Sequence, residues 1–218
     1  MKTLHLPYLH GWDYLARSHM PVTGMFFFYV LPMSLIPPLM LYYAGTAYND
    51  NLLPGLTLTT GQLQILSGVF FVAELAGVFL MAGAIEFMAN TELKVIHSGQ
   101  KLLDYPAEAP TLDTPVNVPR VEYHDAFMLA AIAPTPLWLA PLILFVPSFM
   151  IDMTVGVLAL LASALILYYA TPAILKLDEK GEGALFRYMM VAGGMVAWAA
   201  MMYLTLITWS RVTSPLPY

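Results

Sequence analysis

One acidic side chain lies deep inside a long apolar stretch of this sequence, where its chemistry would be exceptional. Glu74 stands in the run GVFFVAELAGVFLMAGAIEF. It follows Gln64, where a membrane-spanning helix is expected to begin, by about ten residues or about 15 Å, which places it near the centre of a bilayer. A carboxyl group there costs about 2.5–3.5 kcal/mol on insertion scales, so a functional role is the default hypothesis. No Lys or Arg lies at a matching depth, so we expect Glu74 to be protonated or hydrogen-bonded to hydroxyl groups.

Three hydroxyl groups are candidate partners of Glu74, because each is expected near the middle of another apolar stretch: Ser34, Thr135 and Ser163. A role in handling a proton or a substrate would place these groups and Glu74 beside a cavity. A structural role would need only an interhelical hydrogen bond that holds the helices together. The sequence leaves both interpretations open.

The rest of the sequence offers no further set of catalytic or ligand residues. There is no cysteine, and the five histidines show no paired ligand spacing. A phosphate-binding glycine loop, a nucleophile elbow and a dinucleotide fingerprint are likewise missing from the sequence. We therefore expect no enzymatic activity, no metal site, no cofactor and no nucleic-acid partner.

The elements that must position these residues are membrane-spanning helices. Of the 218 residues, 59% are hydrophobic and 11% are charged, whereas soluble domains carry about 25% charged residues. A bilayer core of about 30 Å needs about 20 mostly apolar residues per helix. Five stretches meet this requirement and predict an all-α, polytopic transmembrane helical bundle: residues 22–46, 64–90, 125–147, 149–175 and 187–209.

The basic residues predict the orientation of the chain in the membrane. Of the nine Lys and Arg residues, only Arg211 falls on the side of the bilayer that holds the C-terminus. Because cytoplasmic loops collect Lys and Arg, we expect the N-terminus in the cytoplasm and the C-terminus outside. Residues 211–218 then form an outer tail.

Two segments outside the spans are expected on the cytoplasmic side. Residues 1–21 form a tail, and the pattern LPYLHGWDYLARSHMP within it predicts an amphipathic helix lying in the interface. Residues 91–124 form a loop with a short amphipathic helix around residues 93–103. This loop is either a docking surface for a partner or a solvated tether. Asp125, which follows the loop, is expected to cap the third span and to favour its dipole.

Prolines interrupt two of the five spans. Span one contains Pro32, Pro37 and Pro38, and span three contains Pro134, Pro136 and Pro141. Each proline removes a helical hydrogen-bond donor, and membrane helices tolerate this when a neighbouring group satisfies the freed carbonyl. The hydroxyl groups of Ser34 and Thr135 are close enough in sequence to do so. Kinked helices of this kind either line a cavity or pack against straight neighbours, and both arrangements fit the pattern.

Two segments resemble the Yip1 family in its short bacterial branch: LPMSLIPPLMLYYAG, residues 31–45, and YHDAFMLAAIAPTPLWLAPLILFVPS, residues 123–148. The run that contains Pro134, Pro136 and Trp138 carries most of the resemblance. The layout of five spans agrees over residues 12–210.

The resemblance implies a multi-pass protein of the bacterial cytoplasmic membrane with its N-terminus in the cytoplasm. Eukaryotic members act in early secretory traffic and associate with Rab-type GTPases and with one another. Those members carry a long soluble region ahead of the spans, which residues 1–21 do not provide, and this difference argues against a GTPase partner here. The family positions carried over are Asp125, Pro134 and Pro136.

Two functional hypotheses follow. The first is a non-enzymatic protein that organises the membrane or its partners, which would be the lipid bilayer, other membrane proteins or further copies of this chain. The second is a small transporter or channel subunit, working as an oligomer, with Glu74 in a proton or substrate path between spans one and three.

Overall fold

A computed structural model describes residues 21–48, 58–103, 120–175 and 182–213, with the backbone alone for 92–103 and 182–184. These residues form helices and no strand, and five helical stretches are long and apolar enough to cross a membrane. The predicted all-α bundle with five spans is therefore confirmed. The predicted interfacial helix within residues 1–21 lies outside the described residues.

Spans one and three are broken, as their prolines predict. Span one runs as α2 (Val22–Met25), the π-helical turn η1 (Phe26–Val30), α3 (Leu31–Ser34) and α4 (Ile36–Ala47). Span three runs as α7 (Tyr123–Ile132), α8 (Thr135–Leu139) and the 3₁₀ segment η2 (Ala140–Phe145).

The prolines fall where a helix can accept them. Pro32, Pro37, Pro136 and Pro141 each lie in the first two positions of a segment. A first-turn residue has no acceptor for its N–H group within its own helix, so proline costs the new segment no hydrogen bond, although the segment before it loses a donor. Each break thus ends one short helix and starts the next with a compatible residue.

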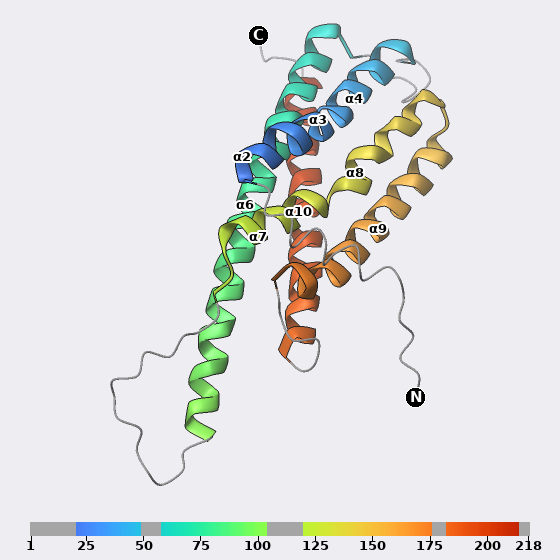
Figure 1. The fold of residues 1–218 in the computed structure, drawn as a ribbon. Helices are drawn as coiled ribbons and strands as arrows, with labels where there is room; N and C mark the ends of the chain where they lie inside the picture. The colour runs from blue at the N-terminus through green and yellow to red at the C-terminus, as the bar shows by residue number, and fades with distance from the viewer. Residues whose placement is uncertain (1–20, 49–57, 104–119, 176–181, 214–218) are drawn as a thin grey trace.

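The other three spans are continuous helices: α6 (Thr60–Leu103), α9 (Phe149–Leu175) and α10 (Glu182–Thr213). A capping box starts α6, because the amide of Thr59 donates to Gln62 Oε1 at 2.8 Å and the amide of Gln62 donates to Thr59 Oγ1 at 3.3 Å. The helix then continues for 44 residues, or about 66 Å. Figure 1 shows its end projecting beyond the other helices.

The short helix predicted around residues 93–103 is therefore not a separate element. The structure makes it the continuation of α6. The sequence between residues 90 and 103 contains neither proline nor a helix-ending glycine motif, so nothing stops the helix where the apolar stretch ends.

Hydrogen bonds at both ends of the bundle show that the spans alternate in direction. At one end, Tyr48 donates to the Phe145 carbonyl at 3.3 Å, and Gln62 Nε2 donates to the Val212 carbonyl at 2.7 Å. At the other end, the Asn90 side chain accepts from the Val121 amide at 2.9 Å and donates to its carbonyl at 3.1 Å. We call this second end the basic end, because Arg120 and Arg187 lie there.

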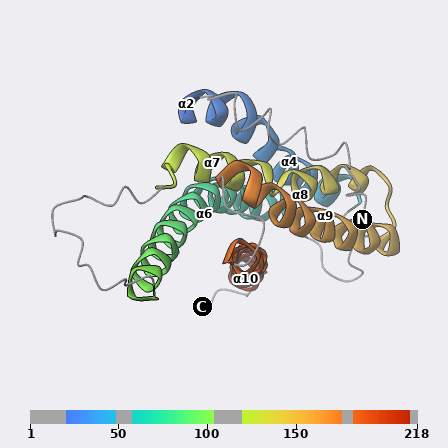
Figure 2. The ribbon, with the colours of Figure 1, turned by 60° about the horizontal axis from the view of Figure 1, so that its bottom comes forward.

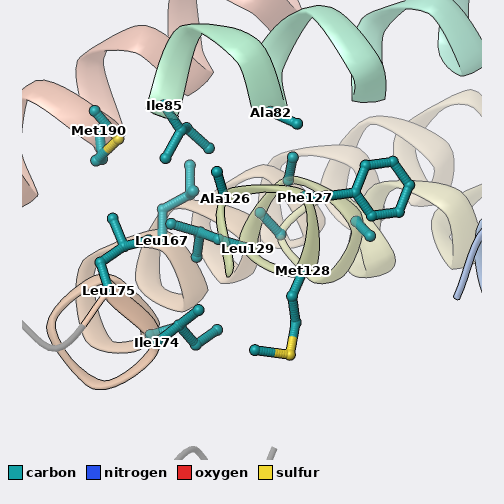
Figure 3. Close-up of a cluster of buried hydrophobic side chains, with 14 of the residues drawn as sticks. Ala82, Ile85, Ala126, Phe127, Met128, Leu129, Leu167, Ile174, Leu175 and Met190 are labelled. Carbon is teal, nitrogen blue, oxygen red and sulfur yellow. The ribbon is translucent and has the colours of Figure 1, made fainter. Parts of the chain in front are cut away.

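Helix α7 is the centre of the bundle. Every residue from Asp125 to Ala131 is buried, which means that other helices cover all faces of this short helix. Figure 3 shows Ala126 under Ala82 and Ile85 of α6, with Leu129 facing Leu167 of α9. Small side chains such as Ala82 and Ala126 let the backbones approach closely, which is how helices gain packing energy in lipid. The result is a tightly packed core toward the basic end.

Helix α10 stands at the edge of the bundle. It packs mainly on α6 and α9, and Figure 2 shows it on the opposite side of them from α2. Gly194 lies against Leu167 so closely that a β-carbon at this position would collide with the leucine side chain. The remaining surface of α10 is largely exposed, including Val196 and Tyr203.

Gly45 provides a test of the packing between spans one and two. A β-carbon at Gly45 would collide with both terminal methyl groups of Leu63, which is itself buried. We expect Gly45→Ala to lower the free energy of unfolding by about 1–3 kcal/mol through overpacking. Gly68 in α6 has open space at the same position and is the matched control. Unfolding of both variants in mixed micelles would measure the difference, and equal stability of Gly45→Ala and Gly68→Ala would contradict this packing.

Candidate functional site

The break in span three exposes backbone carbonyl groups in the middle of the membrane. Pro136 has no N–H group, so the Ile132 carbonyl loses the donor that a regular helix would supply. The Thr135 hydroxyl takes over this role and donates to the Ile132 carbonyl at 2.5 Å. The prediction that Thr135 satisfies a carbonyl freed by proline agrees with this bond.

Span one has a comparable device. The π-helical turn η1 and the helix end at Ser34 interrupt its regular bonding. Ser34 is fully buried, and its hydroxyl donates to the Leu31 carbonyl at 3.1 Å. This carbonyl lies in the last turn of α3, where intrahelical donors are missing. Its regular donor would be the Leu35 amide and not a proline position, so the prediction that Ser34 satisfies a carbonyl freed by proline was wrong.

The two broken spans meet at their interruptions. The hydroxyl groups of Tyr29 and Thr135 lie 2.6 Å apart. Because the Thr135 hydroxyl already donates its single hydrogen to the Ile132 carbonyl, the Tyr29 hydroxyl is the donor in this pair. The Tyr29 ring also packs edge-on against Trp138, with 6.5 Å between ring centroids. These three residues form one contiguous group with Glu74, which contacts Trp138. We call this group the break cluster: Tyr29, Glu74, Thr135 and Trp138.

Glu74 enters the break cluster from α6. Its side chain is 5% exposed, and the indole N–H of Trp138, a residue 2% exposed, donates a hydrogen bond to its carboxyl group. The second carboxyl oxygen, Oε2, is buried and has no hydrogen-bond partner among the described residues. Glu74 thus holds α8 against α6 with one oxygen and leaves the other without a bond.

The sequence predicted hydroxyl partners for Glu74, and the structure provides an indole instead. Ser34 and Thr135 use their hydroxyl groups on backbone carbonyls. Ser163 in α9 is buried, and its Oγ has no partner among the described residues. The family motif drew attention to Trp138, but its contact with Glu74 was missed. A buried indole N–H usually finds an acceptor, and that rule was the available signal.

Asp125 does not cap α7. The helix begins at Tyr123, and the residue in the capping position, Glu122, makes no side-chain cap. Asp125 is the third helical residue, where its charge still favours the helix dipole. Its carboxylate lies 3.3 Å from His124 Nδ1 at the basic end. The predicted cap was wrong because the helix starts two residues earlier than the apolar stretch.

The surface of the bundle has one further feature, a crevice that lies far from the break cluster. A crevice of about 190 Å³ lies between α6 and α10 at the basic end, lined by Phe87, Met88, Thr91 and Met189. Phe87 is about 20 Å from Glu74 along the helix axis. In the part of the chain that is described, no group of three or more His, Asp or Glu side chains is arranged to hold a metal ion.

A profile of the Yip1 domain matches residues 7–201, which is most of the chain. The chain belongs to the Yip1 domain family. No curated protein and no solved structure matches it. The Yip1 match spans all five membrane-crossing stretches up to residue 201 and includes the whole break cluster. The break cluster is therefore part of the Yip1 domain of this chain, and the expectation of this family is confirmed.

The Thr135 hydroxyl is expected to stabilise this Yip1 domain measurably. Thr135→Val keeps the shape of the side chain but leaves the buried Ile132 carbonyl without its donor. We expect it to lower the free energy of unfolding by about 1–3 kcal/mol. Thr135→Ser retains the hydroxyl and serves as the control, which should stay close to wild type in mixed-micelle unfolding. Equal losses in the two variants would show that methyl packing, and not the hydrogen bond, matters at this position.

Proposed function

We propose that this multi-pass membrane protein of the Yip1 family is non-enzymatic and organises the membrane or partner membrane proteins. The observation that carries the proposal is the complete burial of α7 from Asp125 to Ala131. Apolar side chains from α6, α9 and α10 pack around it toward the basic end. An interior filled in this way favours action through the outer surfaces of the bundle.

The side of the bundle formed by α10 is the surface that we propose for partners. In the most apolar 18-residue stretch of the α10 span, only 6% of the residues are buried within the chain. The corresponding share is 33% for span one and 39% for span three. Val196 is 70% exposed near its middle. Other membrane proteins or a second copy of this chain can reach this surface within the bilayer.

Site-specific photo-crosslinking tests this surface. A photoreactive residue at Val196 should give protein adducts in native membranes, because this side chain points away from the bundle. Phe28 is 88% exposed in η1, the segment that follows α2, and it reports whether the surface of α10 is preferred as a crosslinking site. Ala82 is fully buried and is the negative control. The proposal would be rejected if Val196 gave no protein adduct, or no more than Ala82.

Transport through the bundle is the second candidate, and the unpartnered Oε2 of Glu74 is the observation that favours it. The Glu74→Gln variant separates the two candidates, because glutamine keeps the size and hydrogen bonds of the side chain but cannot exchange a proton. For an organising protein, we expect the variant to recover the same crosslinked partner in the same amount as wild type. Unchanged partner recovery together with a loss of proton or substrate flux would instead favour transport.

We further propose that the basic end faces the cytoplasm of a bacterial inner membrane, because Lys and Arg collect on the cytoplasmic side. The chain has no cysteine, so a single introduced thiol can be labelled without background. In intact cells, an impermeant maleimide should label Ser148→Cys, between spans three and four, and leave Glu122→Cys unlabelled. The reverse pattern would invert the proposed orientation.

A further inference from the structure

The crevice between α6 and α10 lies where these two helices separate. Further from the basic end they are in van der Waals contact, since a β-carbon at Gly193 of α10 would lie 3.8 Å from Met81 Cε of α6. Figures 1 and 2 both show the two helices diverging toward the basic end. The crevice of about 190 Å³ lies on this diverging side. Within a bilayer, such a wedge is filled either by a lipid chain or by another protein.

The lining of the crevice suits an apolar occupant. Three of its four lining side chains are those of Phe87, Met88 and Met189. The fourth, Thr91, donates its hydroxyl hydrogen to the Phe87 carbonyl at 2.7 Å, so this hydrogen is not available to a guest molecule. A buried water molecule needs about 2–4 polar partners and takes about 30 Å³. The crevice has room for several waters but does not offer them these partners.

The two methionines also make the crevice adaptable in shape. Met88 forms its inner wall, because it packs against the buried core, whereas Phe87 is 71% exposed and forms its outer rim. Methionine side chains are unbranched and polarisable, so they adjust to an irregular neighbour. An acyl chain is unbranched in the same way and can follow such a surface. The lining therefore favours the chain of a lipid.

A lysine follows the crevice at the edge of the apolar stretch. The membrane-crossing part of α6 ends at Thr91. Lys94 comes three residues later, about 4.5 Å further along the axis and on the side of the helix that carries Phe87 and Thr91. Glu92 is two residues from Lys94 and so belongs to the opposite side of the helix. Basic residues at this level attract anionic lipid headgroups.

We propose that this crevice is a binding site for an anionic phospholipid. One acyl chain lies between α6 and α10 against Met88 and Met189, and its phosphate group lies at the level of Lys94. The lipid fills the wedge between the diverging helices, so the lipid composition at the basic end influences how far apart they stand. The site is separate from the partner surface around Val196, which lies about 10 Å further along α10.

Lipid retention tests the headgroup preference. The purified chain is mixed in detergent micelles with equal amounts of phosphatidylglycerol and phosphatidylcholine that have identical acyl chains, and native mass spectrometry measures which lipid is retained. We expect about a fivefold preference for phosphatidylglycerol, the contribution of one basic residue at a membrane surface. Lys94→Gln should abolish this preference. Free glycerol 3-phosphate should not displace the lipid, and displacement would show that the phosphate group alone is bound.

Lys101→Gln is the matched control for the charge. It removes the same charge seven residues, or about 10 Å, further out on the same side of α6, so the preference should stay as in wild type. Equal loss of the preference in the two glutamine variants would show a general attraction to the protein surface and would overturn the site. Retention of both lipids in equal amounts by wild type would overturn it as well.

Two tryptophan variants test the crevice itself. Met189→Trp fills the space for the acyl chain and should lower the amount of phosphatidylglycerol retained. Val196→Trp adds a similar side chain to the exposed surface of α10 and should retain as much lipid as wild type. Thermal unfolding without added lipid checks that both variants fold. Unchanged retention in a folded Met189→Trp variant would refute binding in the crevice.

Photo-crosslinking at Met189 identifies the occupant without filling the crevice. In native membranes, a photoreactive residue there should give lipid adducts that are richer in phosphatidylglycerol than those formed at Phe28, which is 88% exposed. Adducts of equal composition would show bulk lipid only, and protein adducts at Met189 would show that a partner fills the wedge. Either result would overturn the lipid site. Missing protein adducts at Val196 would count against the partner surface alone.

Discussion

The need to pair every backbone polar group inside a hydrocarbon solvent governs this structure. Proline removes donors at the centre of spans one and three, where water cannot replace them. The Thr135 hydroxyl returns one of these donors locally, and the Ser34 hydroxyl supplies a donor to the Leu31 carbonyl where α3 ends. The broken spans then lie against each other through Tyr29 and Thr135, so the interruptions that would weaken isolated helices join two spans at mid-membrane.

Apolar length and proline positions were sufficient to predict five spans and the two that are broken, because both signals are local in sequence. The same local reasoning found the bond of Thr135. It failed for Glu74, whose partner Trp138 depends on the register of α8 against α6, and register is set by packing between distant segments. The end of α6 and the start of α7 were also misplaced, because a helix does not have to stop where its apolar stretch stops.

Two kinds of interaction hold the bundle together along its length: van der Waals packing and directional hydrogen bonds. Toward the basic end, alanine-rich faces around α7 bring helices into close van der Waals contact. Near the breaks, directional bonds from Tyr29, Thr135 and Trp138 fix which segment faces which. Close packing supplies energy with little directional preference, whereas these bonds specify one alignment of the short segments.

The unbroken course of α6 has a mechanical consequence. A continuous helix bends only gently over its length, with a radius of about 60–100 Å, and it has no joint where the apolar stretch ends. The projecting end of α6 and the segment that carries Glu74 are therefore parts of one stiff helix. Force from a molecule bound to the projecting end would be transmitted along α6 to its buried half. It would reach the break cluster without a rearrangement of the helix between these two parts.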